Sequence, residues 1–196
     1  MKALMSTTRL APARERLLAA ALARFGSEGP AGVTLEDVRS EAGVSVGALY
    51  HHFADKSALL DALYVELLAE SQSEMVADLR EHATAEGGIK AGVRLYLRWV
   101  TANRNGAGVL LTHQPDAQIL RELNRPFFAE VQAWWDTHVH YGAVRELPLE
   151  LVTALWLGPA QEYTRRWLAG RSKRMPAAVT TVLQQAAWDA LRKEPI

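Results

Sequence analysis

The chain of 196 residues contains no cysteine, which excludes disulfide bonds and thiolate chemistry. Its net charge is zero, because 22 Lys and Arg residues balance 22 Asp and Glu residues. This balance argues against a protein that coats nucleic acid through its overall charge, so any DNA contact must come from a few locally placed groups. The sequence also lacks a long uninterrupted apolar run, so we expect no transmembrane helix. The lack of cysteine fits the cytoplasmic location that we expect.

Motifs for catalysis and metal binding are also missing. We find no Gly-x-Ser-x-Gly elbow, no phosphate-binding glycine loop and no nucleotide-binding fingerprint. His138 and His140 are two positions apart, which places them on different sides of a helix, and no His-Glu-x-x-His spacing occurs. The sequence therefore predicts a protein that is not an enzyme and that needs neither a metal nor another cofactor.

Apolar residues recur at helical spacing along most of the chain, and strand-like alternation persists nowhere. We predict an all-α protein of about nine helices. The expected helices cover residues 13–28, two short segments between 33 and 54, 55–80, 88–103, a short segment through 110 and 111, 116–141, a segment opening at 147–148, and a last one from 176.

Small, polar and helix-breaking residues predict the interruptions. Residues 81–87 are expected to form a connection, and Asn105, Gly106 and Gly108 to break the helical pattern. Pro126 and the pair Gly158 and Pro159 lie inside helical segments, where we expect kinks.

The segment from Val33 to Lys56 predicts a helix-turn-helix. Thr34 is suited to cap the first helix by accepting a hydrogen bond from a backbone N–H of its first turn. Gly43 is placed to end that helix in the left-handed conformation, and Ser45 offers a second cap two residues later. No Lys, Arg, Asp or Glu lies between Gly43 and Ala54, so the second helix carries uncharged or titratable polar groups. Such a helix can lie in a groove of DNA and read it.

This segment, VTLEDVRSEAGVSVGALYHHFADKSALL, resembles the DNA-binding motif of the tetracycline-repressor (TetR) family. The resemblance covers about residues 13–64, and the rest of the chain matches only in helix count and layout. It implies an N-terminal helix-turn-helix head, joined by a long fourth helix to a helical domain for ligand binding and dimerisation. We expect a flexible arm at 1–12, a DNA-binding domain at 13–54, and a ligand-binding and dimerisation domain at 55–196.

The resemblance also implies which residues contact DNA. Thr34 and Lys56 would bind phosphates, Tyr50 would reach a phosphate through its hydroxyl, and His51 and His52 would reach a base edge or phosphate. The start of the recognition helix, where the approach to DNA is closest, would consist of Ser45, Val46 and Gly47. Val46 cannot form the bidentate hydrogen bonds to guanine that a Lys or Arg could form at this position, although it can contact a thymine methyl group. Arg39 is a candidate for reading guanine, or a surface charge.

An aromatic cluster after residue 98 suggests a small-molecule site. Apolar walls with a few polar groups are typical of effector pockets. The predicted ligand-binding residues are Trp99, Phe127, Trp134, His138 and Trp156, with Glu162 or His113 as a polar handle. Taken singly, each aromatic residue is better explained by packing in the core or at a dimer interface. It is their combined number, more than a helical bundle needs, that indicates a pocket.

Together these features predict a homodimeric repressor that binds a palindromic operator in double-stranded DNA and is released by a small, mostly apolar effector. The predicted dimer surface consists of Leu151, Leu155, Gly158, Val179, Leu183 and Ala187. An activator, or a regulator that needs no ligand, stays open at this point. The alternative from another class is a helical enzyme or small-molecule carrier with a vestigial DNA-binding head.

Overall fold

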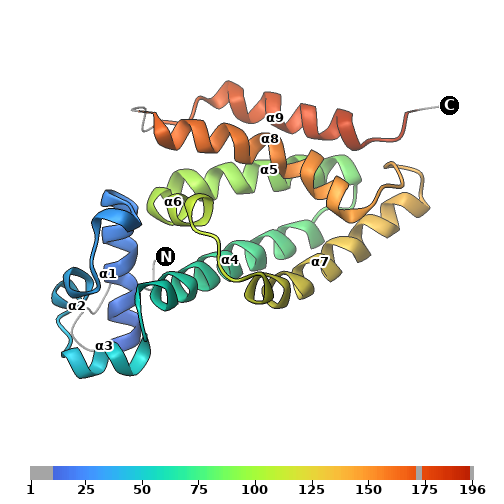
Figure 1. The fold of residues 1–196 in the computed structure, drawn as a ribbon. Helices are drawn as coiled ribbons and strands as arrows, with labels where there is room; N and C mark the ends of the chain where they lie inside the picture. The colour runs from blue at the N-terminus through green and yellow to red at the C-terminus, as the bar shows by residue number, and fades with distance from the viewer. Residues whose placement is uncertain (1–10, 171–173, 195–196) are drawn as a thin grey trace. The chain divides into compact units, whose positions relative to one another are not determined.

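The computed structural model describes residues 11–170 and 174–194. Most of the predicted N-terminal arm lies outside these residues. Within the described ranges the chain is all-α, as predicted (Figure 1). Its elements are α1 (Ala13–Glu28), the 3₁₀ turn η1 (Pro30–Gly32), α2 (Leu35–Ala42), α3 (Val46–His52), α4 (Lys56–Arg80), α5 (Ala85–Ala102), α6 (Arg104–Thr112), α7 (Ala117–His140), α8 (Leu149–Ala169) and α9 (Ala177–Leu191). None of these helices combines the length and hydropathy that a bilayer crossing requires.

The described chain forms two compact units. The first unit is made of Met1–Leu68 with Arg104–Ala117, and it contains α1, η1, α2, α3, the first part of α4, and α6. Helix α1 is central to this unit, because α2, α3 and α6 all pack against it. At the contact with α6, a side chain on Gly26 would meet Cβ of Asn105 at 2.1 Å. Only glycine at this position lets the two helices approach so closely.

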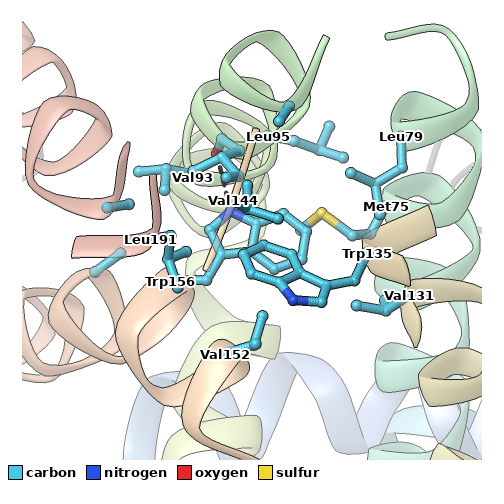
Figure 2. Packing of buried hydrophobic residues seen from close by; sticks show 14 of the residues in the cluster. Met75, Leu79, Val93, Leu95, Val131, Trp135, Val144, Val152, Trp156 and Leu191 are labelled. Atoms are coloured by element: carbon cyan, nitrogen blue, oxygen red, sulfur yellow. Dashed lines mark hydrogen bonds between the residues drawn. The ribbon is translucent and has the colours of Figure 1, made fainter. Parts of the chain in front are cut away.

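The second unit is made of Ala69–Asn103 with Gln118–Ile196, and α5, α8 and α9 pack against one another in it (Figure 1). Its core contains two indoles, Trp135 from α7 and Trp156 from α8, surrounded by aliphatic residues (Figure 2). The segment between α7 and α8 is tied to the end of α9 by an isolated bridge between Val144 and Arg192. Within this bridge the backbone N–H of Arg145 donates to the carbonyl of Leu191 at 2.9 Å.

Most predicted boundaries are confirmed to within a residue or two, and two predictions are wrong. Helix α5 begins at Ala85, inside the expected connection, because the Thr84 hydroxyl caps it by accepting from the N–H of Gly87. Asn105, Gly106 and Gly108 do not break the helical pattern. The break lies at Asn103, whose N–H and side-chain amide both donate to the Trp99 carbonyl. The division into functional domains stays a prediction.

Candidate DNA-binding head and candidate effector region

The helix-turn-helix begins with a capping box on α2. The Thr34 hydroxyl accepts from the N–H of Asp37 at 3.2 Å, and the Asp37 carboxylate accepts from the N–H of Thr34 at 2.8 Å. This reciprocal pair satisfies two backbone donors that a helix start otherwise leaves without partners. The hydrogen bonds from Thr34 favour the carboxylate form and lower the pKa of Asp37. The predicted cap at Thr34 is therefore confirmed.

The turn between α2 and α3 is fixed by Gly43 and Arg39. Gly43 adopts φ 60° and ψ 38°, the left-handed conformation predicted for it. Arg39 donates from Nη1 to the carbonyl of Val44 at 2.7 Å, and its other guanidinium nitrogens bind Glu36. This pairing lowers the pKa of Glu36 and holds the guanidinium against the turn. Ser45 then caps α3 by accepting from the N–H of Ala48 at 3.1 Å.

Helix α3 has one buried side and one exposed side. Leu49 is only 1% exposed, and Phe53, which ends the helix, is buried as well. Val46 and Tyr50, one helical turn apart, are 55% and 57% exposed. Ser45, Gly47, His51 and His52 are exposed as well. Two large side chains of this helix are therefore open to contact by a partner.

Lys56 lies at the start of α4 and connects the two ends of the helix-turn-helix. Its Nζ donates to the carbonyl of Val33 at 2.9 Å, the residue just before the Thr34 cap. This hydrogen bond brings together the two ends of the helix-turn-helix, Thr34 and Lys56, that were predicted to bind phosphates. The contact with Val33 was missed in the sequence, because no local pattern pairs residues 23 positions apart.

The structure places two of the predicted ligand-binding tryptophans in the core. Trp156 donates its indole N–H to the carbonyl of Ile89 at 2.8 Å, and its ring lies over Gly92. Trp99 is buried on α5. Two glycines four residues apart on α5 are the sequence signal for such packing, because Gly92 leaves room for the indole of Trp156 and Gly88 for that of Trp134. A ligand-binding role for Trp99 and Trp156 stays a prediction, which requires a rearrangement of this core.

Trp134 and His138 are brought together on α7, with ring centroids 4.3 Å apart. Trp134 packs against Gly88 and lines a depression of about 260 Å³ with Val76, Leu79, Arg80, Glu130 and Ala133. Burial lowers the pKa of His138, so its imidazole is neutral at neutral pH. A second depression, of about 530 Å³, lies between the end of α7 and residues 146–148. Trp135, His140 and Glu146 are among the residues that line it.

The three remaining predicted ligand residues lie elsewhere. His113 belongs to the first unit, where its Nε2 lies 2.6 Å from the Asp61 carboxylate. Glu162 is exposed on α8 and binds Arg165 and Arg166, which lowers the pKa of its carboxyl group. Phe127 packs against the core of the second unit and against Phe128. Neither predicted polar handle is among the residues that line the depression at Trp134. No group of three or more His, Cys, Asp or Glu side chains suited to a metal occurs in the described part of the chain.

The predicted dimer surface on α8 and α9 is partly exposed. Leu151 is 45% exposed, and Val182, which is not among the predicted residues, is 64% exposed. Leu155, Gly158, Val179 and Leu183 are half-buried. Ala187 is buried in the core of its own chain, since its side of α9 packs against neighbouring helices, and so it offers no surface to a partner.

Comparison with known proteins agrees with this head and fold. Residues 17–63 match the family described as bacterial regulatory proteins, tetR family. The HTH-type transcriptional regulator BetI of Rhizobium meliloti (strain 1021) is 30% identical over 112 residues, which are 57% of this chain and 55% of that protein. The matched segment thus spans about half the length of this relative.

Solved structures extend the likeness over most of the chain. A putative tetR family transcription regulator from Shewanella sp. PV-4 superposes with a TM-score of 0.78 at 20% identity, covering 94% of this chain and all of that one. The regulator FadR from Bacillus subtilis, in complex with stearoyl-CoA, has a TM-score of 0.76 at 18% identity, with 88% and 96% coverage. Residues 17–63 of this chain thus match the tetR family, and its fold is the one found in solved structures described as TetR family regulators.

Proposed function

We propose that this chain is a homodimeric, ligand-responsive transcriptional repressor that acts in the cytoplasm on double-stranded operator DNA. The observation that carries the proposal is that helix α3 has one buried side and one exposed side. Leu49 and Phe53 anchor it to the head, while Val46 and Tyr50 stand exposed on its other side. Its exposed side carries no Asp or Glu to repel phosphates. The regulators that the chain resembles support the same function.

In this proposal the head binds DNA with phosphate contacts at its ends and base contacts in its middle. Thr34, Tyr50 and Lys56 position the head on phosphates, while Ser45, Val46 and His51 face the base edges, and Gly47 allows close approach. Arg39 contributes by fixing the turn, because its guanidinium is already bound to Glu36 and Val44. Two such heads would enter successive major grooves about 34–36 Å apart on a palindromic operator.

Dimerisation through α8 and α9 would supply much of the affinity, because one head offers few cationic contacts. The exposed Leu151 and Val182 support this surface. Sedimentation of the L151E/V182E variant should yield monomers, because two carboxylates in an apolar interface would lack partners. Tyr141, which is 78% exposed at the end of α7, offers the matched control, and Y141E should stay dimeric. Equal sedimentation of both variants would refute the proposed surface.

Effector release is the third part of the proposal. The depression beside Trp134 and the FadR complex with stearoyl-CoA support a small-molecule ligand in the second unit. An effector acts by binding the DNA-free conformer more tightly than the DNA-bound one.

DNA binding is tested by fluorescence anisotropy with the DNA upstream of the chain's own gene. Affinity should fall steeply with salt, since phosphate contacts release counterions. K56A should weaken binding to all sequences, whereas changes at Ser45, Val46 or His51 should alter which operator is preferred. K193A removes one positive charge from an exposed position beyond α9 and should bind normally. No binding to any DNA by the unmodified protein would favour the enzyme or carrier alternative.

A further inference from the structure

A surface depression of about 400 Å³ lies in the second unit, along the last two turns of α5 and beside the start of α9. None of the residues predicted to bind an effector or a second subunit lines it. Its lining consists of Arg94, Leu97, Arg98, Thr101, Ala102, Met175 and Thr180.

Two guanidinium groups give this groove its charge. Arg94 and Arg98 are exposed and four residues apart on α5, which puts them next to each other on one helix face. Like charges at this spacing repel each other. Within residues 11–170 and 174–194, neither side chain pairs with a carboxylate. Lys90, four residues before Arg94 on α5, forms an ion pair with Glu86 at 2.5 Å. The first turn of α9 contains no acidic residue that could pair with the two arginines.

The rest of the groove is mainly apolar. Leu97 is a core residue, and Met175 packs against the core cluster. The Thr101 hydroxyl donates to the carbonyl of Leu97 at 2.7 Å, which leaves its methyl group for contact. Guanidinium groups bind carboxylates and phosphates through paired N–H donors, and aliphatic walls favour a hydrocarbon chain. The groove thus offers both halves of a site for an amphipathic anion.

We propose that this groove binds a small amphipathic anion, with a carboxylate or phosphate head on Arg94 and Arg98 and an alkyl body against Leu97 and Met175. This inference rests on the proposed function in one respect, because the molecule bound in the groove would be the effector of the repressor. Its position supports that role. Helix α5 ends at Ala102, and α6, which packs against α1 through Asn105 and Gly26, begins two residues later. An occupant that shifts the end of α5 would therefore act on the chain directly before α6.

Isothermal titration calorimetry with decanoate and decyl phosphate, without DNA and below the concentrations at which micelles form, tests the site directly. Both probes should bind the unmodified protein, and the R94Q/R98Q variant should bind at least tenfold more weakly. The matched control is R121Q/R125Q, which removes two arginines at the same spacing from exposed positions of α7. This control should bind as the unmodified protein does. Equal loss in both double variants, or no loss in either, would overturn the proposal.

Two further probes separate the halves of the site. Decyltrimethylammonium carries the same chain with a positive head and should not bind, whereas equal binding would mean nonspecific adsorption of the chain. Inorganic phosphate should bind far more weakly than decyl phosphate, and equal affinity would rule out the apolar half.

The A102E variant keeps both arginines and tests the charge argument in another way. Ala102 is exposed at the end of α5, and the new carboxylate would lie four residues from Arg98. It should neutralise Arg98 within the chain and weaken decanoate binding. Unchanged affinity would contradict the assignment. Operator binding is measured separately on the ligand-free protein, so a failure of DNA binding and a failure of anion binding give different results.

Discussion

The indole of Trp156 lies where a side chain on Gly92 would have to be. A Cβ atom on Gly92 would approach Cζ2 of this ring to 2.3 Å, far inside van der Waals contact. The indole N–H donates to the carbonyl of Ile89, which lies on the same helix as Gly92, and this hydrogen bond fixes the ring at this position. The close approach of α5 and α8 therefore depends on a residue with no side chain.

We expect G92A to lower the free energy of unfolding by about 1–3 kcal/mol, because the added methyl group overpacks a rigid core. Urea denaturation followed by circular dichroism measures the change. G108A is the matched control, since Gly108 is also helical and has open space around it. It should raise the stability by up to about 1 kcal/mol through helix propensity. If G92A were also stabilising, the described packing of Trp156 would be incorrect.

The same pair of residues explains what the sequence could predict and what it could not. The caps at Thr34 and Ser45 and the left-handed Gly43 were predictable because each depends on residues within one or two turns. Core packing of Trp156 depends on which helix lies opposite, and α5 is more than 50 residues away in the chain. Hydrophobic periodicity places the indole on the inner side of α8 but does not say whether a helix or a cavity faces it.

In the candidate DNA-binding head, too, features that depend on nearby residues were predictable and contacts between distant residues were not. The order of its helices and the exposed side of α3 come from local spacing and were predicted. The role of Arg39 was not, because its contact with the Val44 carbonyl exists only after Gly43 has turned the chain back. Likewise, the hydrogen bond from Lys56 to Val33 requires that the whole head has folded.

Removing the Thr34 hydroxyl should weaken the head. We expect T34A to lower the free energy of unfolding by about 1 kcal/mol, the usual effect of losing an N-cap. The variant should also raise the pKa of Asp37, because hydrogen bonds from Thr34 keep that pKa low. T34S retains the hydroxyl and should behave almost as the unmodified protein. Titration of the Asp37 carboxyl by NMR and urea denaturation test both effects, and an unchanged Asp37 pKa in T34A would contradict them.

Gly47 allows stability and DNA binding to be separated. Nothing lies within 4 Å of a Cβ placed on this residue, so G47A should be neutral or stabilising by up to about 1 kcal/mol. If the backbone of α3 approaches DNA here, the same methyl group should lower operator affinity at least tenfold, or about 1.4 kcal/mol. Anisotropy titrations measure the affinity, with G108A as a control that should be stabilised and bind normally. Full affinity in G47A would exclude close approach of DNA at Gly47.

His138 should make stability depend on pH. It is only 8% exposed, and burial lowers its pKa below the value of 6.5 that an unfolded chain would have. Between these two pKa values the unfolded chain binds a proton that the folded chain does not. Stability is therefore unaffected by this residue well above pH 6.5 and is lost as pH falls below it, by at most about 1.4 kcal/mol per pH unit.

Urea denaturation at pH 7.5 and 5.5 should show a smaller loss for H138Q than for the unmodified protein. H140Q, at an exposed position two residues away, is the control and should lose stability as the unmodified protein does. The same loss in H138Q as in the unmodified protein would mean that the imidazole takes up its proton equally well in the folded chain.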